Sequence, residues 1–129
     1  MAGKSAVRTD RAPAPVQDAP YSQAIRFAGL IFVSGQIALR PGTTQMAGTT
    51  IQEQTAQALA NLGAILEAAG SGLERVVKTT VFLRHMSDFA AMNDVYRRVV
   101  GAVPPARSTV EVSALPNGAL VEIDAIASA

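Results

Sequence analysis

Two charged side chains in the last third of the sequence have types and settings that could support chemistry. Arg107 follows the rigid segment Pro-Pro-Ala (residues 104–106), and its planar guanidinium can bind a carboxylate through two hydrogen bonds. Glu122 lies in an otherwise apolar run, where a carboxylate belongs either to a solvated face or to a polar site in an interface. Alternatively, Arg107 is a surface arginine at a strand edge, and Glu122 shares a solvated edge with Asp124.

Other polar residues give weaker signals. Gly35 interrupts a predicted strand and permits a ligand to approach the backbone, and Ser34 beside it offers a hydroxyl, although such bulges are common. Tyr21 follows a proline, which usually indicates packing. Asn93 in a predicted helix fits a solvent-facing position equally well, and His85 is expected in an exposed loop.

The sequence lacks the motifs of several large enzyme classes. It contains no cysteine, one histidine, no phosphate-binding glycine loop and no serine nucleophile elbow. We therefore expect no metal and no cofactor. An arginine, a carboxylate, hydroxyls and backbone donors suit the addition of water to a small electrophile that carries a carboxylate.

Simple geometry restricts how the two charged residues can cooperate. If residues 117–118 formed a two-residue hairpin turn, Glu122 would face Ser113, roughly 20 Å along the strand from Arg107. The two side chains could then act together only if their strands are not hairpin neighbours, or if they come from different subunits.

Length and composition set the class of protein. The 129 residues, 49% of them hydrophobic, predict one domain over residues 1–129, and the net charge of +1 argues against a nucleic-acid partner. Residues 1–20 have no apolar run typical of a signal peptide, and no stretch is long and apolar enough for a membrane span. We expect a cytoplasmic protein without a membrane partner.

The hydrophobic pattern predicts an α+β fold, a two-layer sandwich in which two helices cover one face of a mixed five- to six-stranded sheet. Thr50 and Glu53 form a capping box for the first helix, and Ser87 is predicted to cap the second, whose buried side includes Phe89. The opposite sheet face mixes apolar and charged residues, which indicates a homo-oligomer. The predicted elements are an extended lead-in over 1–20 with a possible first strand, strands over 22–28 and 30–37, a helix over 50–69, a strand over 76–84, a helix over 88–100, and strands over 107–112 and 120–127.

Seven segments in order resemble the RidA/YjgF family of reactive-intermediate (imine and enamine) deaminases, over about residues 7–127. Pro-Ala-Arg-Ser, followed by the Glu-Ile strand at the C-terminus, is the most specific part of this resemblance. The segments are Ala-Pro-Tyr-Ser-Gln-Ala (19–24), Phe-Val-Ser-Gly-Gln-Ile (32–37), Glu-Gln-Thr-Ala-Gln-Ala-Leu-Ala-Asn-Leu (53–62), Val-Val-Lys-Thr-Thr-Val-Phe-Leu (76–83), Asp-Phe-Ala-Ala-Met-Asn-Asp-Val-Tyr (88–96), Pro-Ala-Arg-Ser-Thr-Val-Glu-Val (105–112) and Val-Glu-Ile-Asp-Ala-Ile-Ala (121–127).

The resemblance implies a chorismate-mutase-like fold, a homotrimer with sites between subunits, and hydrolysis of 2-imino acids to 2-oxo acids and ammonia. The imino acids arise from 2-enamino acids such as 2-aminoacrylate, which pyridoxal-phosphate-dependent dehydratases release. Arg107 falls on the family's carboxylate-binding arginine and Glu122 on the glutamate that holds the attacking water. The positions that line the family's pocket correspond to Tyr21, Ser34, Gly35, Asn93 and Thr109.

The sequence departs from the family pattern at two positions, and three other functions are possible for a protein of this fold. Ala19 replaces a glycine, which could shift the Tyr21 loop, and Thr109 replaces the cysteine of some members. The alternatives are a pathway-specific deaminase such as the 2-aminomuconate type, a non-catalytic 2-oxo-acid-binding or chaperone-like protein, and a ribonuclease or translation inhibitor of the same fold.

Overall fold

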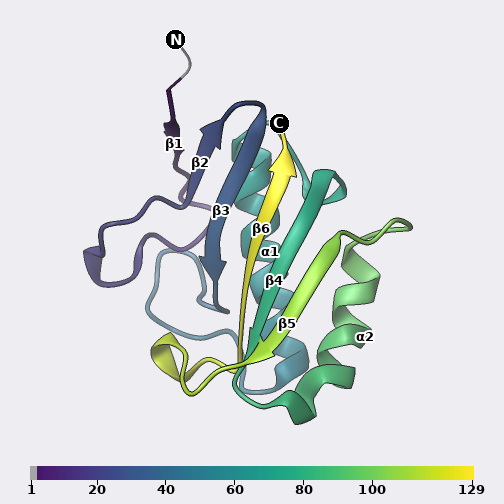
Figure 1. Cartoon of the computed structure of the whole chain (residues 1–129). Helices are drawn as coiled ribbons and strands as arrows, with labels where there is room; N and C mark the ends of the chain where they lie inside the picture. The colour runs from purple at the N-terminus through teal and green to yellow at the C-terminus, as the bar shows by residue number, and fades with distance from the viewer. Residues whose placement is uncertain (1–2) are drawn as a thin grey trace.

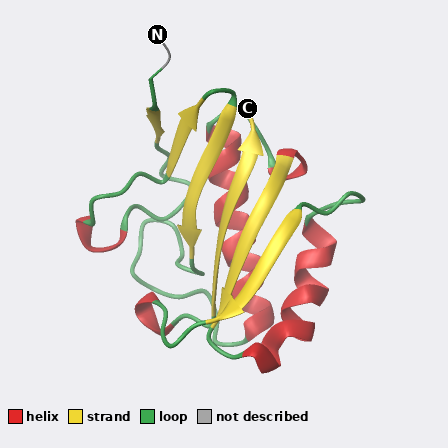
Figure 2. Cartoon of the chain, viewed as in Figure 1, coloured by secondary structure: helices red, strands yellow, loops and turns green. Residues whose placement is uncertain are grey.

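The computed structural model describes residues 3–129 as a six-stranded sheet with two helices on one face, which confirms the expected α+β architecture (Figures 1 and 2). The strand order is β1-β2-β3-β6-β4-β5, and only the β4–β5 pair is parallel. The elements are β1 (Ser5–Val7), β2 (Ala24–Phe27), β3 (Leu30–Gln36), α1 (Ile51–Ala68), β4 (Val76–Leu83), α2 (Phe89–Val99), β5 (Ala106–Glu111) and β6 (Val121–Ser128), with short 3-10 turns η1 to η4 between some of them.

Helix α1 begins where the capping box predicts. The Thr50 hydroxyl accepts a hydrogen bond from the Glu53 amide (3.1 Å), while the Glu53 carboxylate accepts from the Thr50 amide (3.2 Å). These bonds satisfy donors that the first helical turn leaves free, and they lower the pKa of Glu53 because they favour its charged form. The helix ends before Gly70, whose φ of +80° is the left-handed conformation that glycine adopts readily.

Two details of the second helix differ from the prediction. Ser87 does not cap it, because the chain leaves β4 through the 3-10 turn η3 (Met86–Asp88), and Ser87 lies inside that turn. The N-cap is Asp88, without a side-chain hydrogen bond. Phe89 was expected in the core but is 40% exposed, since the first turn of α2 lies at the rim of the sheet.

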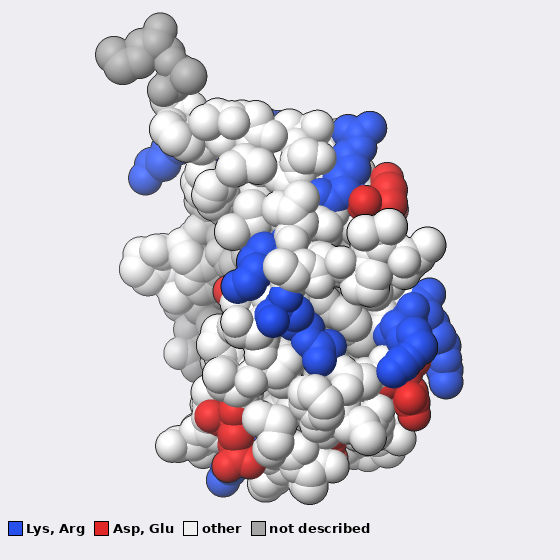
Figure 3. Space-filling model, turned by 45° about the vertical axis from the view of Figure 1, so that its right-hand side comes forward, with Lys and Arg blue, Asp and Glu red and all other residues white. Residues whose placement is uncertain are grey.

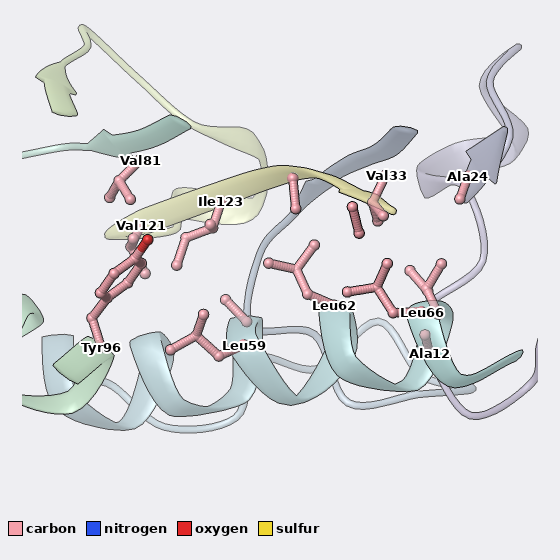
Figure 4. Close-up of a cluster of buried hydrophobic side chains, with 14 of the residues drawn as sticks. Ala12, Ala24, Val33, Leu59, Leu62, Leu66, Val81, Tyr96, Val121 and Ile123 are labelled. Atoms are coloured by element: carbon pink, nitrogen blue, oxygen red, sulfur yellow. The ribbon is translucent and has the colours of Figure 1, made fainter. Parts of the chain in front are cut away.

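The core lies between α1 and the sheet (Figure 4). Leu59 and Leu62 of α1 extend towards the sheet, which contributes Val81 and Ile123 to the same core, and all four are almost completely buried. Along β6 the odd-numbered residues are buried and the even-numbered ones half-buried, so the second face of the sheet is left without a helical cover. No helix within residues 3–129 is long and apolar enough to cross a membrane.

The position of β4 matters most for the site. Strands β5 and β6 follow each other in the chain, yet they do not pair, because β4 lies between them. The segment that joins them contains the 3-10 turn η4 (Pro116–Gly118), in which Asn117 has a φ of +57°. Residues 117–118 therefore do not form a two-residue hairpin turn between β5 and β6.

The capping box makes a testable contribution to stability. Replacing Thr50 by alanine leaves the Glu53 amide without its acceptor and should lower the free energy of unfolding by about 1 kcal/mol. Urea denaturation followed by circular dichroism measures this difference. Thr49→Ala serves as the control, because only the backbone amide of Thr49 contacts Glu53, and equal losses in the two variants would contradict the capping assignment.

Candidate active site

The Glu122 carboxylate lies on the open face of the sheet, beside a bulge in β3. The register between β3 and β6 shifts between Val33 and Gln36, so that Gly35 faces Glu122. A Cβ atom at Gly35 would overlap the Glu122 carboxylate, so a larger residue there would displace the carboxylate from its present position. The sequence pattern identified this glycine as a place of close approach, and the structure shows that the approaching group belongs to the protein itself.

Ser34 precedes Gly35 in the chain, Tyr21 shares a small cavity with Gly35, and both are engaged in hydrogen bonds of their own. The Ser34 hydroxyl donates to the carbonyl oxygen of Ser22 (2.6 Å), which ties β3 to the segment that follows Tyr21. The Tyr21 hydroxyl accepts a hydrogen bond from the Val16 amide (2.8 Å), and Tyr21 and Gly35 border one small cavity of about 20 Å³. We call Tyr21, Ser34, Gly35 and Glu122 the Glu122 cluster.

Burial raises the pKa of Glu122. Desolvation of the half-buried carboxylate is the larger cause, and the negative charge of Asp124 on the same face is the smaller one. Asp124 is itself held in place, since its Oδ1 accepts a hydrogen bond from the Thr80 amide (2.9 Å). A carboxylate whose proton is retained more readily than usual is suited to take up and return protons.

Arg107 lies on β5 against the outer helix α2. Its guanidinium carbon is 4.8 Å from the centre of the Tyr96 ring and 5.5 Å from that of Phe89, and Nη1 is 4.0 Å from the Met92 sulfur. Among residues 3–129 no carboxylate lies within ion-pairing distance of it. The arginine is thus held by uncharged groups, and its charge is free for an external anion.

Asn93 and Thr109 flank this arginine. Phe89, Asn93 and Tyr96 are spaced four and three residues apart and so share one side of α2. Thr109 follows Arg107 by two residues on β5 and shares its face. The side-chain oxygen of Asn93 is buried and accepts no hydrogen bond within the described chain, which is unusual for an amide oxygen. We call Asn93, Arg107 and Thr109 the Arg107 cluster.

Within one protomer the two clusters lie on opposite faces of the sheet. Arg107 pairs with Thr79 of β4, whose side chain is buried beneath the helices, whereas Glu122 pairs with Phe82, three residues further along. Since successive side chains of a strand alternate between faces, Arg107 and Glu122 point in opposite directions. The two can act on one small molecule only if they come from different protomers.

Two large hollows of the protomer contain neither charged residue. One of about 770 Å³ lies between the N-terminal segment and the loop after β3, and another of about 720 Å³ includes Tyr21 but neither Arg107 nor Glu122. No group of three or more metal-binding side chains occurs in the part of the chain that the structure describes.

Sequence reasoning missed the side chains that hold Arg107. Helical spacing alone predicts Phe89, Met92 and Tyr96 on the buried side of the second helix. That spacing could not show that an arginine from β5 lies across these residues. The signal available in hindsight is an aromatic and thioether stripe on a helix that precedes an arginine-bearing strand.

The chain matches known proteins over almost its whole length. Residues 10–129 match the family model described as Endoribonuclease L-PSP. The chain is 48% identical over 124 residues to a RutC family protein of Pyrococcus horikoshii, covering 96% of this chain and 97% of that protein. It is 44% identical over 124 residues to the 2-iminobutanoate/2-iminopropanoate deaminase of Mus musculus, covering 96% and 90%. The crystal structure of the Rid-family protein YyfA of Yersinia pestis superposes with a TM-score of 0.92 at 45% identity, covering 98% and 100%.

The two causes of the Glu122 pKa can be separated experimentally. Asp124→Asn removes the neighbouring charge but keeps an oxygen that can accept from the Thr80 amide, so the pKa of Glu122 should fall while staying above that of an exposed glutamate. A carboxyl NMR titration of wild-type and variant protein measures this. An unchanged Glu122 pKa in the variant would show that Asp124 has no influence.

Proposed function

The chain belongs to the RidA/YjgF family, and from that membership we propose that it is a hydrolytic deaminase that converts 2-imino acids, and the 2-enamino acids from which they form, to 2-oxo acids and ammonia. The observation that carries the proposal is the Arg107 guanidinium, which is fixed in place and has no acidic partner in the described chain. The name of the mouse relative supports the reaction type, with 2-iminobutanoate and 2-iminopropanoate as the first substrates to test.

In the proposed mechanism Arg107 binds the substrate carboxylate through two hydrogen bonds and fixes the imine carbon near a water molecule held by Glu122. The imine reacts in its protonated form (C=NH2⁺): as the water oxygen bonds to the carbon, the C=N π electrons move to nitrogen and Glu122 accepts a proton from the water, which leaves a carbinolamine with a hydroxyl and an NH2 group. Glu122 then donates that proton to the NH2 nitrogen, the C–N bond breaks with its electron pair going to the departing NH3, and loss of the hydroxyl proton to water gives the 2-oxo acid. The carbon does not change oxidation level, so the reaction needs water and proton transfer but no redox cofactor.

We propose that each site takes the Arg107 cluster from one protomer and the Glu122 cluster from its neighbour, in a homotrimer. The opposite orientation of the two clusters supports such a division. The open face of the sheet also exposes large apolar side chains that a neighbour would cover, among them Phe27 (47% exposed), Phe32 (38%) and Val110 (42%).

The proposed ligand is a small 2-imino or 2-oxo acid. The proposed compartment is the cytoplasm.

A ribonuclease is the alternative that the description of the family model favours. Figure 3 views the side that carries α2 and β5, and basic and acidic side chains are scattered there among uncharged ones. A nucleic-acid surface is normally a continuous basic patch. RNA cleavage that follows the purified oligomer and is lost with a single substitution in either cluster would favour the ribonuclease over the deaminase.

Removing the arginine should abolish most of the activity. In an assay coupled to a serine or threonine dehydratase, Arg107→Ala should lower kcat/KM roughly 30- to 900-fold, since a bidentate charged pair contributes about 2–4 kcal/mol. Arg11→Ala is the matched control, because Arg11 forms only an exposed ion pair with Glu67 (3.5 Å). Equal activity of the Arg107 variant and the wild type, or no acceleration by the wild type, would contradict the proposal.

Mixing two inactive variants tests the division of the site between protomers. After Arg107→Ala and Glu122→Gln proteins are dissociated and reassembled together in equal amounts, about a quarter of the interfaces should combine an intact Arg107 with an intact Glu122. Activity should therefore return to about a quarter of the wild-type value. Each variant reassembled alone is the control. Mixtures that stay inactive despite proven exchange would place both residues of a site in one protomer.

A further inference from the structure

The side chains that contact the Arg107 guanidinium, those of Phe89, Met92 and Tyr96, are arranged so that they can orient it. Tyr96 lies closest, with its ring centre 4.8 Å from the guanidinium carbon. We propose that Tyr96, locked by a hydrogen bond to Thr79, is a positioning residue that sets the direction of the Arg107 guanidinium and thereby the affinity for the carboxylate of the substrate. This inference rests on the proposed function and extends it from the binding residue to the groups that orient it.

Tyr96 is fixed at both ends. Its backbone belongs to α2, and Figure 4 shows the ring extending from that helix towards the sheet. The Tyr96 and Thr79 hydroxyl oxygens are 2.7 Å apart, and the two residues are only 5% and 3% exposed. Thr79 lies on β4 directly opposite Arg107 of β5. Thr79 of β4 thus bonds to the Tyr96 hydroxyl, the Tyr96 ring lies against the Arg107 guanidinium, and Arg107 lies on the strand that pairs with β4.

Packing of the core does not by itself require the buried hydroxyl groups of Thr79 and Tyr96. Thr79 shares the helix-facing side of β4 with Val81 and Leu83, which are apolar and completely buried. A valine and a phenylalanine would fill the same volume without burying two hydroxyl groups that must satisfy each other. The hydroxyl pair does supply a fixed ring orientation, which packing alone defines less sharply.

An aromatic ring suits this position better than an acidic side chain. The face of the ring attracts the guanidinium, but it offers no carboxylate oxygen that would compete with a bound anion. The Met92 thioether, 4.0 Å from Nη1, is only a weak acceptor. The arginine is therefore held in direction while its hydrogen-bond donors remain available to the substrate.

The test separates the ring from its hydroxyl. Tyr96→Leu removes the ring, and we expect the dissociation constant of 2-oxobutanoate, measured by calorimetry, and the KM for the imino acid to rise about tenfold with little change in kcat. Tyr96→Phe and Thr79→Val keep the ring but lose its anchor, and should give a smaller rise of about two- to threefold. Val95→Ala, on a buried neighbour of the same helix, controls for loosening of α2 and should leave both constants unchanged. Sedimentation confirms assembly of each variant, and if Tyr96→Leu does not fold, the Phe and Val variants provide the result.

A double-mutant comparison shows whether Tyr96 acts through Arg107. In the Arg107→Ala background, Tyr96→Leu should not weaken 2-oxobutanoate binding further, because the group that it orients is gone. The same loss in both backgrounds, or an equal loss in Val95→Ala, would overturn the positioning role.

The outcomes also distinguish this inference from the proposed function. If the wild type binds 2-oxobutanoate but does not hydrolyse the imine, the deaminase proposal fails and the binding data alone decide the role of Tyr96. If the wild type neither binds nor hydrolyses, both proposals are overturned.

Discussion

The insertion of β4 between β5 and β6 is the constraint on which the arrangement of the candidate site depends. Because strands alternate their side chains between two faces, the register of β4 with its two neighbours directs Arg107 towards the helices and Glu122 towards the open face. A protomer built in this way presents the Arg107 cluster and the Glu122 cluster on opposite faces of the sheet. The proposed chemistry therefore depends on the proposed oligomer, because the register that separates Arg107 from Glu122 leaves them able to act together only across two protomers.

The two charged groups are held by opposite physical means. Arg107 lies against aromatic and thioether groups that fix its position without neutralising its charge. Glu122 lies in a partly desolvated place made by the absence of a side chain at Gly35, where burial and Asp124 both favour its protonated form. In the proposed mechanism, the arginine binds the substrate carboxylate and the glutamate exchanges protons. This division of tasks suits the addition of water to an imine that already carries a carboxylate.

Much of the fold could be predicted because it depends on local patterns. The capping box of Thr50 and Glu53 and the periodic apolar residues fixed the extent of α1 to within about a residue at each end. The start of α2 was less well predicted, since a 3-10 turn places Ser87 inside the turn rather than at the cap. Phe89 was assigned to the core because helical spacing cannot reveal where a sheet ends.

The sequence by itself determined the chemical inventory and the two layers: one arginine in a rigid frame, one carboxylate in an apolar strand, and a sheet with a single covered face. It also limited how Arg107 and Glu122 could cooperate. Only the tertiary structure decided between the remaining choices, because strand order and register are set by pairing between segments far apart in the chain. The contact of Tyr96 with Arg107 and the closeness of Gly35 to Glu122 arise in the same way, from packing between elements that no local spacing records.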